Sequence, residues 1–140
     1  YIDSYFHKYP GVKLYMERTK EIAKERGYVE TFFGRRLYLP GIHSGRSRMA
    51  AERAAINAPM QGTAADIMKI AMIEIHEWLT KTKVDARMIM QVHDEVILEV
   101  KDQDASKVEQ EVAKIMQDAA KLRVPLEVES GLASNWGEAH

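Results

Sequence analysis

The chain has 140 residues, and its hydrophobic and charged fractions of 46% and 29% indicate a soluble globular protein rather than a disordered one. The absence of cysteine excludes disulfides and thiolate metal sites, and no apolar run approaches the ~20 residues of a membrane span. The formal net charge of -1, taken alone, argues weakly against a nucleic-acid binder, because phosphate contacts usually need surplus Lys and Arg. Because a chain without cysteine fits a reducing compartment, we expect a cytoplasmic protein. Because it has no long apolar run, we expect no membrane partner.

The first predicted element is a helix with apolar spacing from Val12 and a C-capping Gly27, after a turn at residues 9–11. Two β-rich runs follow at residues 28–31 and 37–40. A glycine-containing turn separates them, so the pattern predicts a hairpin.

Arginines are concentrated in the segment that follows the predicted turn: Arg35, Arg36, Arg46, Arg48 and Arg53. Much of the acidic charge lies later in the chain, so one end could face a polyanion while the other faces water. On charge alone, a solvated basic loop explains the cluster equally well.

An alanine-rich stretch from Ser47 to Asn57 predicts a helix, which Pro59 should end or kink. A second helical run extends from about Gln61 to Leu79. Residues 86–92 and 95–100 alternate and predict two strands, the first with Met88, Met90 and Val92 on one face.

The remaining predicted elements are an amphipathic helix near residues 108–119 and a final strand at residues 124–128, where Pro125 favours a sheet edge. The order after residue 61 is helix, strand, strand, helix, strand. This order is typical of an antiparallel sheet with helices on one face. We therefore predict an α+β fold, with a helical N-terminal half that carries a hairpin, followed by an antiparallel sheet with packed helices.

Asp94 and Glu95 lie at the break between two predicted strands, which places them at a hairpin tip. Hard oxygen ligands at a rigid tip suit Mg²⁺, which binds one or two carboxylates together with phosphates and water. His93 beside them is a candidate general acid or base, or a donor to a phosphate. Polar residues at a turn are also commonly just solvated, and the sequence pattern alone leaves that alternative open.

Arg53, Asn57 and Gln61 recur every four residues and would form one polar stripe on a continuous helix. Such side chains can donate to the acceptors that every base pair offers in the minor groove. Small residues just after Gln61, beginning with Gly62, would permit close approach of a backbone. The alternative is an ordinary solvent-facing stripe.

The segment Gln91-Val92-His93-Asp94-Glu95-Val96 resembles motif C of family A DNA polymerases. Residues 51–66 look like the segment that precedes this motif in the family. Residues 27–31 and 34–36 look like its fingers hairpin, and Asn135-Trp136 looks like its tail. The resemblance follows the family's order along essentially the whole chain.

This resemblance implies a DNA-directed DNA polymerase of replication and repair, which adds a dNTP to a primer 3′-hydroxyl by a two-metal mechanism. It implies that Asp94 is a catalytic carboxylate that coordinates Mg²⁺, with Glu95 beside it in a lesser role. The residues implied to contact primer–template DNA are Arg53, Asn57, Gln61 and His93.

By the same resemblance, residues 1–46 would be part of the fingers subdomain and residues 47–140 the C-terminal half of the palm. The family's second metal-binding aspartate and its dNTP-binding Lys and Tyr have no match in these 140 residues. We therefore expect the rest of a polymerase chain as a partner, no activity from this part alone, and self-association through exposed apolar surface. The alternatives are a non-catalytic nucleic-acid-binding α+β module and a purely structural domain.

Overall fold

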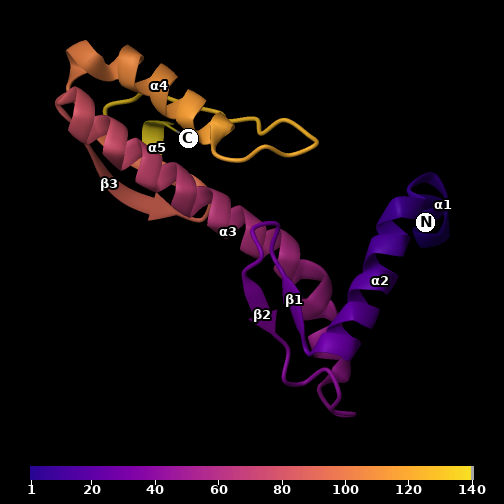
Figure 1. Ribbon diagram of the computed structural model, residues 1–140. Coiled ribbons are helices and arrows are strands. Elements are labelled where there is room, and N and C mark those ends of the chain that lie inside the picture. Colours follow the sequence, from indigo (N-terminus) through magenta and orange to yellow (C-terminus); the bar gives the residue numbers. More distant parts are fainter. Residues whose placement is uncertain (140) are drawn as a thin grey trace. The chain divides into compact units, whose positions relative to one another are not determined.

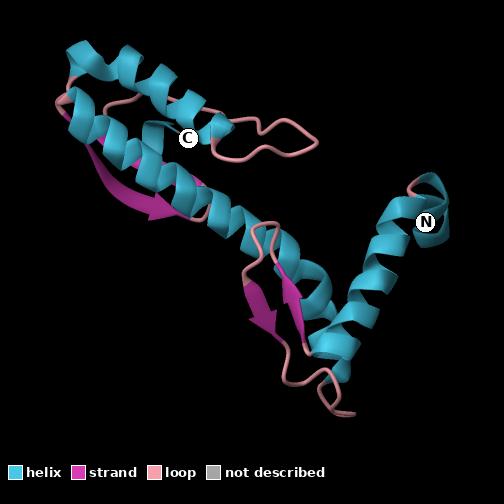
Figure 2. Cartoon of the chain, in the orientation of Figure 1, coloured by secondary structure: helices cyan, strands magenta, loops and turns pink. Residues whose placement is uncertain are grey.

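The computed structural model describes residues 1–139 and has an α+β fold with two separate antiparallel hairpins, which confirms the predicted fold class (Figure 1). Figure 2 shows how helix dominates over strand in these residues. The elements, in chain order, are α1 (Ile2–Lys8), α2 (Pro10–Arg26), β1 (Tyr28–Glu30), β2 (Arg36–Tyr38), α3 (Arg48–Thr82), β3 (Ala86–Val92), β4 (Glu95–Val100), the 3₁₀ turn η1 (Asp102–Asp104), α4 (Ala105–Asp118) and α5 (Trp136–Ala139).

The chain divides into two compact units, the first being Tyr1–Asp66 and the second beginning at Ile67. In the first unit, α2 ends at Gly27 as predicted, because this glycine takes a left-handed conformation with φ of 75°. The β1–β2 hairpin follows, with Tyr28 opposite Tyr38. Residues from α2, the hairpin, the loop after it and α3 form the core of this unit: Ala23, Val29, Leu39, Ile42 and Ala55.

α3 continues without a break through Pro59, so the two helical runs that the sequence predicts are one helix. A proline inside a helix removes one backbone hydrogen bond and costs roughly 3 kcal/mol. Packing offsets that cost here, because Ala55 is fully buried and Ala51 and Ala58 pack against the same core. Tyr15 of α2 also donates its hydroxyl to the Ile56 carbonyl oxygen, at 2.9 Å.

In the second unit, the β3–β4 hairpin packs against α3 and α4. Four buried residues of the two helices form the centre of the core: Ile75, Leu79, Val108 and Val112. From the hairpin, Ala86, Leu98 and Val100 pack against them. Ala86 is opposite Val100, so these side chains belong to one face of the hairpin. The predicted amphipathic helix is confirmed as α4.

The register of β3 against β4 shifts by one residue, since Met88 is opposite Leu98 but Met90 is opposite Ile97. The extra residue on β3 is Ile89, and a bulge of this kind reverses the alternation of faces beyond it. Met90 therefore lies on the opposite face from Met88. The prediction that Met88, Met90 and Val92 share one face is wrong for this reason.

Residues 124–128 do not form the predicted strand, since the strands described within residues 1–139 all belong to the two hairpins. Leu126 and Val128 are still half-buried while their neighbours are exposed, so the predicted alternation of burial is present without the ladder of hydrogen bonds. Just after this segment, the Ser130 hydroxyl donates to Glu109 of α4 at 2.9 Å. Among the described residues, none of the helices has the length and apolar character needed to cross a membrane.

Candidate functional site

The turn between β3 and β4 consists of His93 and Asp94 alone, because Val92 and Glu95 are directly paired. The favoured two-residue hairpin turns have a positive φ at their first position, which glycine and asparagine adopt most easily. His93 occupies this position with φ of 50°. The backbone at the centre of the motif is therefore held in a conformation that a non-glycine residue rarely adopts.

Gln91 stabilises this turn from the preceding strand. Its side-chain nitrogen Nε2 donates to the backbone carbonyl oxygen of His93 at 2.6 Å. Gln91 was part of the motif in the sequence, but its role as a brace was not predicted. A glutamine two residues before a two-residue turn is the signal that points to it.

The two neighbouring carboxylates occupy different settings. Asp94 is exposed at the turn, whereas Glu95 is half-buried as the first residue of β4. The structure thus places Asp94 at a hairpin tip, as expected from the break between the strands. Because the turn is short and Gln91 braces it, the backbone that carries the Asp94 side chain has little conformational freedom.

The donor chemistry of this turn fits Mg²⁺ as one side of a site. Mg²⁺ is commonly held by one or two carboxylates, with water and phosphate oxygens completing its octahedral shell, and Asp94 offers such a carboxylate to solvent. The residues that the structure describes contain no group of three or more His, Asp or Glu side chains placed to hold a metal ion. The remaining ligands would therefore come from substrate, water or other protein segments.

The polar stripe of Arg53, Asn57 and Gln61 lies in the first unit, whereas His93, Asp94 and Glu95 lie in the second. All three stripe side chains are exposed along α3, so the predicted spacing does produce one exposed polar face. The opposite face of this part of α3 contacts the β1–β2 hairpin. Gly62 serves that contact, because an added Cβ would lie 2.8 Å from Thr31 Cγ2.

Several arginines of the basic segment are engaged in ion pairs within the first unit. Arg36 pairs with Glu30 at 3.3 Å, and hydrogen bonding to that carboxylate raises the pKa of Arg36. Glu52 lies between Lys24 and Arg48, at 2.9 and 3.0 Å, and these two cations lower the pKa of its carboxyl.

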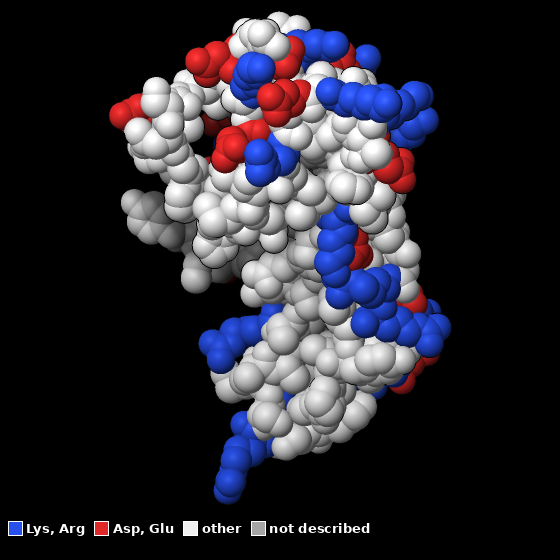
Figure 3. All heavy atoms as spheres, turned by 90° about the vertical axis from the view of Figure 1, so that its left-hand side faces the viewer, with Lys and Arg blue, Asp and Glu red and all other residues white. Residues whose placement is uncertain are grey.

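Exposed pairs of this kind contribute little to stability, but they reduce the positive charge available to a polyanion. Figure 3 shows basic and acidic side chains together on the face that it draws. The basic cluster of the sequence is therefore partly neutralised by its own neighbours.

Comparison with known proteins extends the match to nearly every residue. The family model described as DNA polymerase family A matches residues 1–138. The chain belongs to this family. Its resemblance to family A, first indicated by the motif around Asp94, is thereby confirmed.

Individual relatives agree with this assignment. DNA polymerase I of Pseudomonas aeruginosa is 60% identical over the whole chain, and DNA polymerase I, thermostable, of Thermus filiformis is 48% identical over 99% of it. The chain spans only 16% and 17% of the length of these two relatives.

A solved structure has the same fold. The POL domain of Pol1 from M. smegmatis, in complex with DNA primer-template and dNTP, superposes with a TM-score of 0.95. It is 41% identical, and the match covers 99% of this chain and 25% of that one.

Proposed function

We propose that this chain provides part of the nucleotidyl-transfer site of a DNA-directed DNA polymerase that acts in replication and repair. The observation that carries the proposal is the braced two-residue turn at Asp94, within a chain that belongs to family A. The reaction would be attack of a primer 3′-hydroxyl on the α-phosphate of a dNTP, with release of pyrophosphate. The solved relative in complex with primer-template and dNTP supports these substrates.

In this proposal Asp94 would hold Mg²⁺ from one side, and Glu95 would lie beside it in a lesser role. When bound, the metal would stabilise negative charge that develops on the attacking and leaving oxygens. The described residues fit one side of such a site, so the opposing carboxylate would come from another part of the polymerase chain. The short turn keeps the Asp94 backbone in one conformation, so little ordering is needed when the other groups assemble.

Arg53, Asn57, Gln61 and His93 would contact the primer–template near the site of insertion. The stripe donors would meet the minor-groove acceptors that all correct base pairs share, which tests pair shape without reading sequence. We assign residues 1–46 to the fingers and residues 47–140 to the second half of the palm. The exposed face of the stripe on α3 supports its availability for such contacts.

The proposal is tested by Asp94→Ala in the intact polymerase. Turnover should fall by about three orders of magnitude or more, because a metal-binding carboxylate supports several kcal/mol of transition-state stabilisation. Affinity for primer–template should change little. Single-turnover dNTP incorporation and a DNA-binding titration measure the two quantities separately.

Glu99→Ala is the matched control for this experiment. Glu99 is an exposed carboxylate on the same hairpin, far from the turn in register, where it pairs with Arg87 at 3.5 Å. Its loss should leave turnover close to that of the wild type. Near-normal turnover of Asp94→Ala, or an equal loss in both variants, would contradict the assignment of Asp94.

A further inference from the structure

The turn of the β1–β2 hairpin is bound to α3 by side chains outside the proposed site. Arg35 Nε donates to Asp66 Oδ1 at 2.7 Å, and Arg35 Nη2 donates to the Gly62 carbonyl oxygen at 3.1 Å. The Asp66 side chain is only 12% exposed, so this pair is partly shielded from water. Charge-assisted bonds from the planar fork of arginine are both strong and directional.

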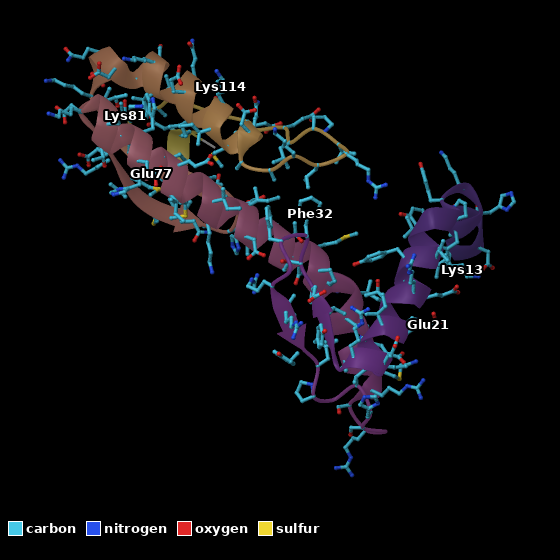
Figure 4. The ribbon with its side chains drawn as sticks, in the orientation of Figure 1. Lys13, Glu21, Phe32, Glu77, Lys81 and Lys114 are labelled. Carbon is cyan, nitrogen blue, oxygen red and sulfur yellow. The ribbon has the colours of Figure 1, made fainter. Side chains whose placement is uncertain are left out.

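A second link joins the same two elements. Thr63 Oγ1 accepts a hydrogen bond from the Phe32 backbone N–H at 2.9 Å and donates to the Pro59 carbonyl oxygen. Figure 4 shows Phe32 at the turn of the hairpin, beside α3. Gly62 completes the contact, since a side chain there would collide with Thr31 and Leu37. The hairpin turn is therefore fixed to α3 at several points.

These contacts lie on one face of α3, and the polar stripe lies on the other. Pro59, Gly62, Thr63 and Asp66 follow a spacing of three and four residues, which places them on the face toward the hairpin. At 3.6 residues per turn, Arg53, Asn57 and Gln61 fall on the opposite side. The hairpin thus contacts the face of α3 opposite the stripe and leaves the exposed face of the stripe uncovered.

The hairpin contacts flank the point at which α3 lacks a backbone hydrogen bond. Pro59 has no N–H, so the Ala55 carbonyl lacks its usual helical partner, and this gap lies between the stripe residues Asn57 and Gln61. Before Pro59, Ala55 packs into the core that Val29 of the hairpin shares. After Pro59, Arg35 binds Gly62 and Asp66. The hairpin therefore bridges both sides of the proline.

We propose that Arg35 is a positioning residue for Gln61: by tying the hairpin to α3 beyond Pro59, it keeps Gln61 in line with Asn57 and Arg53. The inference rests on the proposed function of the stripe. Its consequence concerns selectivity, because a donor held in line favours a matched primer terminus over a mismatched one. Arg35 itself touches no substrate in this account.

The test measures, in the intact polymerase, extension efficiency (kcat/KM) from a matched and from a mismatched primer terminus, and takes their ratio. Arg35→Met should lower this ratio by about fivefold, on the order of the loss of one hydrogen bond. A merely structural role would reduce the fraction of active enzyme, which lowers both efficiencies equally and leaves the ratio unchanged. Arg36→Met is the control, because Arg36 pairs with Glu30 and stacks on Tyr28 within the hairpin.

A double-mutant cycle distinguishes the possible outcomes. If Arg35 acts through Gln61, the variant with both Arg35→Met and Gln61→Ala should show the same ratio as Gln61→Ala alone. The inference would be overturned if the two substitutions multiplied in their effects on the ratio, if Arg35→Met left the ratio unchanged, or if Arg36→Met changed it equally. Each of these results would leave the proposed function intact. A Gln61→Ala variant with an unaltered ratio would overturn both.

A second variant keeps the test decisive if Arg35→Met does not fold. Thr63→Val is nearly isosteric and removes the acceptor for the Phe32 N–H, so it weakens the same attachment. Its ratio should fall in the same direction, by about twofold to fivefold. An unchanged ratio in folded Thr63→Val would then contradict the inference.

Discussion

At the scale of single residues, His93 has two separate roles in the motif around Asp94, one for its backbone and one for its side chain. The backbone must adopt a positive φ, which is 50° here, and the side chain is proposed to lie near the primer terminus. Histidine tolerates the left-handed region better than bulky or β-branched residues do, although less well than glycine. Histidine is therefore compatible with the turn, although the turn alone would favour glycine.

Substitutions at His93 should distinguish the role of its backbone conformation from the proposed role of its side chain. His93→Gly should maintain or slightly raise the thermal stability of the protein while it weakens primer–template affinity. His93→Val should lower stability by about 1–2 kcal/mol, because a β-branched side chain is strained at positive φ. Thermal unfolding and DNA titration of both variants provide the measurement. Equal stability of the two variants would show that this backbone conformation is not maintained.

At the scale of elements, α3 depends on the hairpin that packs against it. Gly62 illustrates this dependence, since a Cβ there would lie 2.8 Å from Thr31 Cγ2 and 3.0 Å from Leu37 Cδ1. The close approach that the sequence suggested at Gly62 is thus used by the protein's own side chains. Glycine in a helix is otherwise unfavourable, so the contact accounts for its presence.

The same glycine-to-alanine change should have opposite effects in two helices. Gly62→Ala should destabilise the protein by roughly 1–2 kcal/mol, since overpacking exceeds the gain in helix propensity. Gly11→Ala in α2 should be neutral or stabilising, because nothing lies within 4 Å of its added Cβ. Chemical denaturation of both variants checks the prediction. Stabilisation by Gly62→Ala would mean that the hairpin does not pack closely on α3.

Local sequence patterns predicted the elements that depend on local chemistry. Gly27 marked the end of α2, and the break before Glu95 marked the β3–β4 turn. Failures occurred where distant packing decides the outcome. α3 passes through Pro59 because a core formed by other elements supports it, and the bulge at Ile89 has no periodic signal.

The candidate site divides in the same way. The exposure of the stripe and the position of Asp94 follow from spacing and strand breaks, which a sequence displays directly. The bond between Arg35 and Asp66 joins residues 31 positions apart, and the arginine cluster that includes Arg35 does not indicate this partner. Only Gly62, a glycine within a predicted helix, pointed to this contact.

At the scale of the whole molecule, the chain spans 16% of the length of its relative, DNA polymerase I of Pseudomonas aeruginosa. The described residues supply one side of the proposed metal site. Apolar side chains such as Ile73, Ile89 and Met90 are exposed, at 59%, 54% and 41%. These exposed side chains are available to pack against other segments or against a second copy of the chain.

The 140-residue chain by itself should not extend a primer, because two-metal catalysis requires ligands from both sides of the ions. The measurement is dNTP incorporation on a primed template by the purified chain, with its Asp94→Ala variant as the control for contaminating polymerase. Incorporation by the chain that its Asp94→Ala variant lacks would contradict the proposal that a further carboxylate is needed.

Changing the Asp94 ligand and the metal ion together shows whether Asp94 binds the catalytic metal. In the intact polymerase, Asp94→Cys replaces a hard oxygen ligand with a soft thiolate, which favours Cd²⁺ over Mg²⁺. Asp94→Cys should be nearly inactive in Mg²⁺ and should regain activity when Cd²⁺ is added, whereas Asp94→Ala should not. Near-normal activity of Asp94→Cys in Mg²⁺ alone, or the same response of both variants to Cd²⁺, would contradict metal binding by Asp94.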